Sequence, residues 1–317
     1  MGLSDNLPKP FFILAPMDDV TDTVFRQIIN DCTRPDLFFT EFVNVDGLQS
    51  PGRPKLIHKL KFSSNEKPII AQLWGLKPEN FAQTTRELKK MGFDGVDLNM
   101  GCPVRTVIKN GACAALIKNR ELADQIIDAT REAAGNDFPV SVKTRVGFST
   151  TDWDWIKFLL DKKLNMLSIH GRTAKQLSKV PADWDLIGQV RELRDSLSPD
   201  TLIVGNGDVM TRQQGLELAN KHGLDGIMIG RGIFHDPFLF AEHSPWADWT
   251  KEQKIGLYQK HIELFAKTWK NGEYRFDSLK KFAKVYINGF DGASEARTQF
   301  MQSTTTDEAL QKLTKLV

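Results

Sequence analysis

Cysteine is scarce in this sequence: only Cys32, Cys102 and Cys113 occur among 317 residues. An odd number in a chain of this length argues against a disulfide framework, which secreted domains build from paired cysteines. No Cys-x-x-Cys or mixed Cys/His spacing points to zinc. We therefore expect neither a bound metal nor a structural disulfide.

Long hydrophobic runs are also lacking. No apolar run approaches the ~18 residues that cross a bilayer. The start of the chain, from Met1 to Pro10, is polar and contains proline, without the charged-then-apolar pattern of a secretory leader. These features favour a cytoplasmic protein that does not enter a membrane.

Net charge is small, because 42 lysines and arginines face 40 acids. Hydrophobic residues make up 41% and charged residues 26%, which excludes wholesale disorder and fibrous classes. The charge is uneven, since nine basic residues face four acids between Lys251 and Lys284. This stretch could bind a polyanion, although a solvated helix face explains the same charge equally well.

A short apolar run followed by a longer helix-like segment is the repeating unit of the first 240 residues. The runs cover residues 12–16, 37–42, 69–74, 95–99, 140–145, 166–170, 201–205 and 226–230. Runs buried on both faces must be apolar almost throughout, so eight of them with helical connections predict a parallel sheet. Residues 78–91 and 120–134 are examples of the expected helices, whereas 47–67 lacks periodicity and is expected to loop over the mouth.

Polar residues at the ends of these runs distinguish two folds. They are Met17 with Asp18, Glu41, Gln72, Asn99, Lys143 with Arg145, His170, Asn206 and Arg231. An open doubly wound sheet gathers ligands at one switch point, whereas a barrel brings all eight strand ends around one mouth. Contributions from every strand favour a (β/α)8 TIM barrel, within the α/β class.

The pattern becomes purely helical after residue 245. Helices are expected at 251–269, 278–288, 294–303 and 307–316. We predict a barrel domain over residues 1–245 and a small all-helical domain over residues 246–317. Five aromatic residues recur there at helical spacing and are interpreted as core rather than as base-stacking platforms. They are Trp246, Trp249, Tyr258, Phe265 and Trp269.

Two glycine-rich turns follow the seventh and eighth runs, where barrels often hold a phosphate. They read Gly205-Asn206-Gly207-Asp208 and Gly230-Arg231-Gly232. Glycine lets the backbone approach an anion closely, and Arg231 can neutralise it through two hydrogen bonds. The same glycines can merely close tight turns, but their presence after both runs favours a phosphate site.

Gln72, Lys143 and His170 end the third, fifth and sixth runs and are directed at the predicted mouth. A flavin suits this set, because a cation stabilises its reduced ring and a side-chain amide pairs with its imide edge. A structural role for His170 is an equal alternative.

Cys102 lies in the turn Asn99-Met100-Gly101-Cys102-Pro103 after the fourth run. A single cysteine is more often a small buried hydrophobe than a catalyst. Its place at a strand end, in a turn that Gly101 tightens and Pro103 stiffens, favours a catalytic thiol. Cys113 is interpreted as a packing residue near a helix start, and Cys32 has no assigned role.

Eight motifs, in order, resemble those of the flavin-dependent tRNA-dihydrouridine synthases over essentially the whole chain. They are residues 15–22 (APMDDVTD), 40–42 (TEF), 72–75 (QLWG), 97–103 (DLNMGCP), 141–145 (SVKTR), 170–173 (HGRT), 206–208 (NGD) and 230–232 (GRG). The resemblance implies reduction of the carbon 5 to carbon 6 double bond of a uridine in tRNA. FMN would carry the hydride, NADPH would be the reductant, and Cys102 would act as the general acid.

The resemblance also implies roles for individual residues. The FMN shell corresponds to Pro16, Met17, Asp18, Gln72, Lys143, His170, Asn206, Gly207, Asp208, Gly230 and Arg231. The uracil contacts correspond to Asn99, Lys143 and Arg145. The helical domain would hold tRNA phosphates through a basic stretch that includes Lys280, Lys281 and Lys284. A monomer is expected.

Two positions depart from the pattern of this family. Val104-Arg105-Thr106-Val107 stands where many relatives carry a lysine, and Asp19 stands where many carry a glycine. Two other functions stay open: an FMN-dependent barrel reductase of a small molecule such as a free pyrimidine, and a non-enzymatic RNA-binding protein. Comparing free uridine with tRNA as substrates would separate the first of these from a tRNA enzyme.

Overall fold

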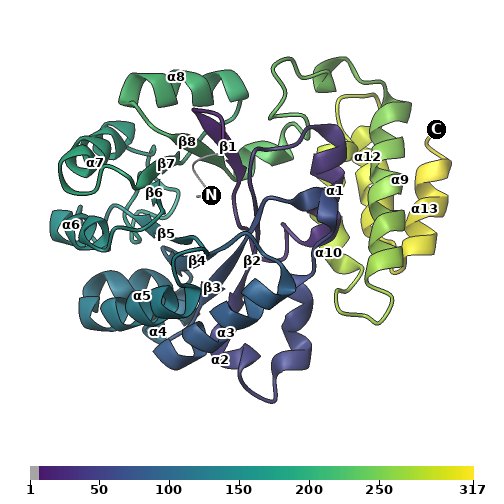
Figure 1. Ribbon diagram of the computed structural model, residues 1–317. Helices are drawn as coiled ribbons and strands as arrows, with labels where there is room; N and C mark the ends of the chain where they lie inside the picture. The colour runs from purple at the N-terminus through teal and green to yellow at the C-terminus, as the bar shows by residue number, and fades with distance from the viewer. Residues whose placement is uncertain (1–6) are drawn as a thin grey trace.

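Eight parallel strands form a barrel in the computed structural model, which describes residues 7–317 (Figure 1). The strands are β1 (Phe11–Leu14), β2 (Phe38–Asn44), β3 (Ile69–Trp74), β4 (Gly95–Met100), β5 (Val140–Arg145), β6 (Met166–His170), β7 (Leu202–Asn206) and β8 (Gly226–Ile229). β1 pairs with β8, and a parallel bridge between Ile13 and Leu37 joins β1 to β2. The (β/α)8 prediction is confirmed, and the open doubly wound sheet is excluded.

Most of the helices between the strands begin at a residue whose side chain caps them. The helices are α1 (Thr23–Cys32), α2 (Val45–Leu48), α3 (Pro78–Met91), α4 (Arg105–Lys109), α5 (Arg120–Ala134), α6 (Trp153–Asp161), α7 (Trp184–Leu197) and α8 (Arg212–His222). Of these, α3 and α4 begin without such a cap. Asp22, Asp152 and Asp183 each accept a hydrogen bond from the N–H three residues later, which satisfies a free donor in the first turn. Gly92 ends α3 at a φ of 84°, a conformation that side chains disfavour.

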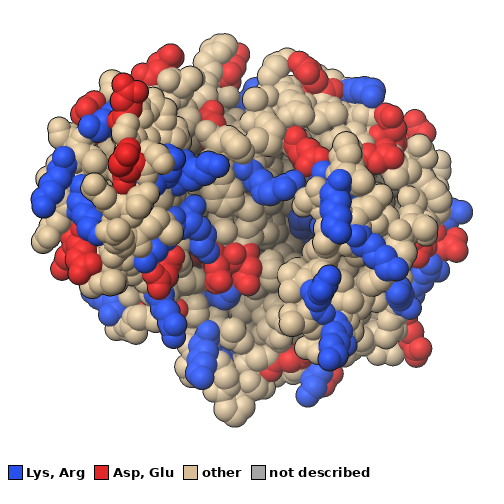
Figure 2. Space-filling view, turned by 180° about the vertical axis from the view of Figure 1, so that it is seen from behind, with Lys and Arg blue, Asp and Glu red and all other residues tan. Residues whose placement is uncertain are grey.

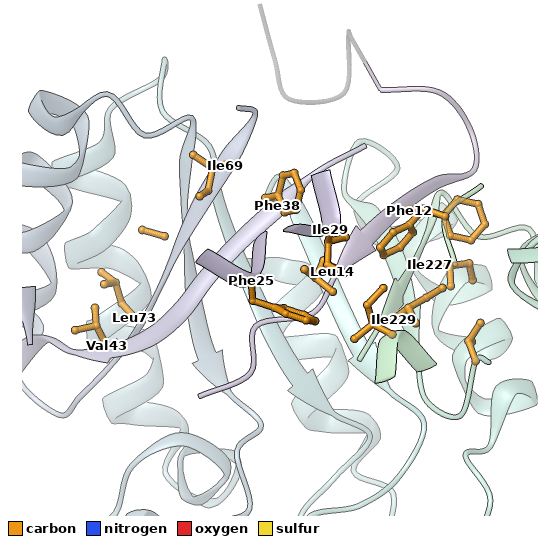
Figure 3. Close-up of a cluster of buried hydrophobic side chains, with 14 of the residues drawn as sticks. Phe12, Leu14, Phe25, Ile29, Phe38, Val43, Ile69, Leu73, Ile227 and Ile229 are labelled. Atoms are coloured by element: carbon orange, nitrogen blue, oxygen red, sulfur yellow. The ribbon is translucent and has the colours of Figure 1, made fainter. Parts of the chain in front are cut away.

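Both faces of the strands are buried, which explains why their sequences are apolar almost throughout. Figure 3 shows part of the layer between the sheet and the helices, where Phe12 and Leu14 of β1 lie near Phe25 of α1. The side chains of opposite parity, such as Phe11 and Ile13, fill the barrel interior as a separate cluster. Each fully buried side chain of this kind contributes about 1.5–3 kcal/mol to folding.

The segment from residue 47 to 67 contains short helical turns. After α2 come the 3-10 helices η2 (Arg53–Lys55), η3 (Ile57–Leu60) and η4 (Ser64–Glu66). A fully buried ion pair, Arg26 to Glu66 at 2.5 Å, fixes the end of this segment to α1. Turns of three or four residues give no periodic pattern, so the sequence could not predict them.

Five helices follow the barrel (Figure 1). They are α9 (Lys251–Thr268), α10 (Asp277–Lys280), α11 (Ala283–Tyr286), α12 (Ala293–Met301) and α13 (Thr306–Thr314). The single helix expected at 278–288 is therefore two short ones. Helix α9 packs against α1, and α11 and α13 pack against α9. Trp246, Tyr258, Phe265 and Trp269 are buried and Trp249 packs against the core, as their interpretation as core residues requires.

Several hydrogen bonds hold the C-terminal segment against β2 and the loop after β1. Trp269 Nε1 donates to the Asp22 carboxylate at 2.8 Å. The Tyr274 hydroxyl donates to Glu41, and Lys281 Nζ donates to the Asp19 carbonyl at 2.5 Å. The division into two domains at residues 245 and 246 stays a prediction. Within residues 7–317, every helix is too short or too polar to span a bilayer.

Candidate active site

A cavity of about 490 Å³ lies at the C-terminal ends of β1, β5, β6, β7 and β8. Nine of the eleven predicted cofactor residues line it: Pro16, Met17, Lys143, His170, Asn206, Gly207, Asp208, Gly230 and Arg231. Ala15, Val209, Met210, Met228, Gly232 and His235 complete the lining. The cavity thus combines apolar walls with cationic side chains, and Asp18 and Gln72 lie outside its lining.

The turns after β7 and β8 form the most polar end of the cavity. Gly207 has a φ of 137°, and a Cβ built on it would lie 2.5 Å from the Cβ of Ala182, so only glycine fits. Asp208 accepts hydrogen bonds from Arg172, from Arg231 at 3.1 Å and from the Ala182 N–H at 2.9 Å. Burial raises the pKa of Asp208, but these donors outweigh it and hold the pKa below its usual value. The Arg231 side chain is 63% exposed, so its guanidinium can also reach an anion in the cavity.

Lys143 and Asn206 connect β5 to β7 at the cavity wall. Lys143 Nζ donates to Asn206 Oδ1 at 3.2 Å, and Asn206 Nδ2 donates to the Met228 carbonyl at 2.8 Å. Burial, followed by the charge of Arg145, lowers the pKa of Lys143 to about 8. The ammonium group is therefore still mostly protonated at neutral pH and places a positive charge beside the cavity.

His170 is held neutral by its surroundings. Burial, followed by the charges of Lys143 and Arg145, lowers the pKa of His170 to about 2. Arg172 Nη1 lies 3.2 Å from His170 Nε2, and a guanidinium can only donate. Nε2 is therefore the acceptor, and the ring proton sits on Nδ1. Sequence reasoning did not assign Arg172 to the site, although its position two residues after a strand-end histidine is a usable signal.

A chain of hydrogen bonds runs from β3 to the cysteine turn. Gln72 is fully buried; its Nε2 donates to Asp97 at 2.7 Å, and its Oε1 accepts from Asn99 Nδ2 at 3.0 Å. Asn99 Oδ1 in turn accepts from the N–H groups of Gly101 (3.2 Å) and Cys102 (3.0 Å). Burial raises the pKa of Asp97 to about 6. Gln72 and Asn99 thus orient the turn that carries the thiol.

Cys102 is half-buried at the end of β4. Its turn packs closely on β5: a Cβ on Gly101 would lie 3.1 Å from the Thr144 carbonyl carbon, and Arg145 Nε donates to the Gly101 carbonyl at 2.9 Å. A hydrogen bond with the Cys113 thiol is the main cause that lowers the pKa of Cys102 to about 7; burial opposes it, and nearby cations support it. The contact with Cys113 could not be predicted, because the two residues are eleven positions apart in irregular chain.

Asp18, a predicted cofactor residue, takes part in a different group of charges. Lys59 Nζ forms an ion pair with Asp18 and lies 3.6 Å from carboxylate oxygens of both Asp19 and Glu41. The three carboxylates lie close together, with this ammonium between them. Whether Asp18 contacts a cofactor stays a prediction.

The three predicted RNA-binding lysines have different surroundings. Lys280 forms an ion pair with Asp277 at 2.8 Å, and Lys281 bonds to the barrel. Lys281 and Lys284 line a groove of about 540 Å³ between the barrel and the C-terminal helices, together with Phe234, His235, Val285, Asn288 and Arg297. His235 also lines the main cavity. Figure 2 shows a hollow near the centre of this face of the molecule, with Lys and Arg side chains on both sides of it.

The fold and the site together define a class: a barrel enzyme whose strand ends surround a cationic cavity. Solved structures share the barrel. Morphinone reductase in complex with tetrahydroNAD matches with a TM-score of 0.51 at 15% identity, covering 77% of this chain and 93% of that one. Histamine dehydrogenase from Rhizobium sp. 4-9 matches with a TM-score of 0.53 at 14% identity, covering 80% and 48%. At these identities the likeness establishes the fold alone.

The chain belongs to the dihydrouridine synthase family, whose model matches residues 13–317. A probable tRNA-dihydrouridine synthase of Staphylococcus aureus (strain COL) is 49% identical over 306 residues, covering 96% of this chain and 92% of the relative. Probable tRNA-dihydrouridine synthase 2 of Bacillus subtilis (strain 168) is 45% identical over 305 residues, covering 95% and 92%. The family resemblance inferred from the eight motifs is confirmed, and the chain is an oxidoreductase.

Proposed function

We propose that this enzyme reduces the carbon 5 to carbon 6 double bond of a uridine in tRNA, using FMN and NADPH. The observation that carries the proposal is a cavity that nine predicted cofactor residues line, with Cys102 on the neighbouring turn after β4, close enough for the charge of Lys143 in the cavity wall to act on its thiol. The names of the relatives from Staphylococcus aureus and Bacillus subtilis support tRNA as the substrate. An enzyme acting on tRNA works where tRNA is found, which supports a cytoplasmic location. We also propose a monomer as the active unit.

The residues of the cavity fit FMN. Arg231 and the backbone around Gly207 suit a phosphate, because an exposed guanidinium and a position that excludes a side chain meet there. Lys143 and the Nδ1–H of His170 can donate to the carbonyl and nitrogen edge of a flavin ring, and Met17 offers an apolar surface. When bound, FMN supplies the hydride that is added to carbon 6 of the uracil.

Cys102 is suited to donate the proton to carbon 5. With a pKa of about 7, a large share of the thiol is protonated at neutral pH while remaining acidic enough to give the proton up. Lys143 and Arg145 stabilise the thiolate that is left, and Asn99 holds the turn through two N–H groups. Proton donation therefore needs no movement of the backbone.

The groove lined by Lys281 and Lys284 suits the phosphates of the bound RNA. A uridine must leave its stack to enter the cavity, at a cost of a few kcal/mol. Contacts between these lysines and phosphates outside the flipped nucleotide offset that cost. The groove adjoins the cavity through His235, so one RNA can occupy both.

The purified protein tests the proposal directly. It should be yellow, release FMN on heating, and convert uridine to dihydrouridine in tRNA with NADPH but leave free uridine unchanged.

Cys102→Ala should still accept electrons from NADPH, while its reoxidation by tRNA should slow by ~10²-fold or more. Wild-type turnover should fall as the pH rises above about 7, because only the protonated thiol donates. A colourless protein that FMN cannot reconstitute, or a Cys102→Ala variant with normal turnover, would contradict the proposal. Mapping dihydrouridine in tRNA from cells lacking the protein would identify the uridine.

A further inference from the structure

Cys102 and Cys113 lie side by side on neighbouring segments of the chain. Cys102 is half-buried, whereas Cys113 is 1% exposed and begins the 3-10 helix η5 (Cys113–Lys118). The N–H of Ala114 donates to the Cys102 carbonyl at 3.3 Å, so the chain returns directly to the cysteine turn. Each thiol also shifts the pKa of the other, as adjacent side chains do. Cys32 lies on α1 and takes no part in this contact.

We propose that Cys102 and Cys113 form a reversible disulfide when the enzyme meets hydrogen peroxide. The pair makes Cys113 a resolving thiol rather than only the packing residue that the sequence suggested. The disulfide would keep the catalytic thiol in an oxidised form that a reducing thiol can convert back.

The surroundings of the two sulfurs give them different roles in the reaction with peroxide. Cys102 is partly exposed, and its lowered pKa gives a large thiolate fraction at neutral pH, the form that reacts with peroxide. Burial, followed by the Cys102 thiol, raises the pKa of Cys113 well above its usual value, so Cys113 is shielded from peroxide and protonated. Oxidation of Cys102 to a neutral sulfenic acid removes the neighbouring negative charge and makes Cys113 easier to deprotonate.

The chemistry balances in two steps. The Cys102 thiolate attacks peroxide, the O–O bond breaks, a sulfenic acid forms, and the departing hydroxide takes a proton to become water. Cys113 then loses its proton and attacks the Cys102 sulfur, the S–O bond breaks, and a second water leaves. Two thiols have been oxidised by two electrons, and one peroxide has been reduced to two waters. A reducing thiol reverses the result by exchange.

The bond has to form through a movement of the Cys102 side chain rather than of its backbone. The two sulfurs must come within about 2.0 Å of each other. The N–H and carbonyl groups of Gly101 and Cys102 are all hydrogen-bonded, so the turn itself is held in place. Cys113 is anchored at a φ of 52°, where a side chain is rarely held unless the surroundings fix it. We therefore expect the half-buried Cys102 side chain to rotate toward a stationary Cys113.

Mass spectrometry of the intact holoenzyme tests the disulfide without reference to uridine reduction. The protein is treated with a small excess of hydrogen peroxide, its remaining thiols are alkylated in denaturant, and it is digested with trypsin. Cleavage at Arg105 and Lys109 separates the peptides 91–105 and 110–118, which carry the two cysteines. The expected product is these peptides joined and two hydrogens lighter than their sum, and dithiothreitol should separate them.

Variants distinguish a resolving thiol from a bystander. In Cys113→Ser, peroxide should carry Cys102 on to the sulfinic acid, and dithiothreitol should not restore the thiol. Cys32→Ser is the matched control and should behave as the wild type. The proposal is overturned if wild-type Cys102 becomes a sulfinic acid, or links to Cys32 or to a second chain. Full recovery of the Cys102 thiol in Cys113→Ser would overturn it as well. The wild-type result decides the question even if a variant fails to fold, and it stands apart from any test of tRNA reduction.

Discussion

The Glu41→Gln substitution should remove a pH dependence of stability that arises where the C-terminal segment meets the barrel. Glu41 is fully buried in the middle of β2; Oε1 accepts from the Asp19 N–H at 2.6 Å, and Oε2 accepts from the Tyr274 hydroxyl. Burial raises the pKa of Glu41 from 4.5 to about 7, against the opposing charge of Lys59. A glutamine has the shape of the protonated acid and can bond to the same two partners.

The direction in which stability changes with pH follows from which state, folded or unfolded, loses the Glu41 proton at the lower pH. The unfolded chain loses the Glu41 proton near pH 4.5, whereas the folded protein keeps it until about pH 7. The stability that Glu41 contributes is therefore complete below pH 4.5 and is lost as the pH rises to about 7. At about 1.4 kcal/mol per pKa unit, the loss is roughly 3 kcal/mol. Glu41→Gln should lie within about 1 kcal/mol of the wild type at pH 5 and exceed it by up to roughly 3 kcal/mol at pH 8.

Urea unfolding at pH 5, 6, 7 and 8 measures this difference. Glu132→Gln, which changes an exposed carboxylate on α5, serves as the control and should leave the wild-type curve unaltered. Other buried acids, such as Asp97, contribute equally to the wild type and to Glu41→Gln, so the difference between their curves isolates Glu41. Parallel curves for these two proteins across the whole range would refute the reasoning.

Arg231→Ala should weaken FMN retention by about 1.5–3 kcal/mol, the range for charge-assisted hydrogen bonds, whereas Arg86→Ala on α3 should not. Flavin content after gel filtration measures this, and equal retention in both variants would place the phosphate elsewhere. Replacing Lys280, Lys281 and Lys284 together by Ala should lower tRNA affinity and flatten its salt dependence by up to about one unit per lost phosphate contact. Lys280→Ala alone should have the smallest effect, because its ammonium is paired with an aspartate. If tRNA binding is unchanged across the salt range, these three lysines form a solvated face that does not bind the RNA.

The barrel and most of the cavity could be predicted because both depend on local pattern. An apolar run buried on two faces is recognisable within six residues, and strands 69–74, 140–145 and 166–170 agree residue for residue with their predicted bounds. The carboxyl ends of parallel strands must meet at one mouth, so the positions of Lys143 and His170 followed from the fold alone.

The structure departs from the predictions where contacts between distant segments determine the position of a side chain. Gln72 pairs in register with Asp97, and Asp97 pairs with Ser141, which stands two residues before Lys143 on β5. Gln72 therefore lies one layer below Lys143 and bonds to Asp97 instead of lining the cavity. Asp18 turns toward Lys59, which lies in a segment without periodicity. The contact between Cys102 and Cys113 likewise depends on how an irregular loop returns, and no spacing rule encodes that.

The cysteine turn joins a held backbone to an exposed neighbouring segment. The backbone groups of Gly101 and Cys102 are all engaged by Asn99, Arg145 and Ala114. Residues 104–106 are exposed, and Val104 has half of its surface open. A side-chain substitution in this segment removes none of the hydrogen bonds that hold the turn. Under the function proposed above, this segment could therefore vary and alter its contacts with an RNA while Cys102 stays in place.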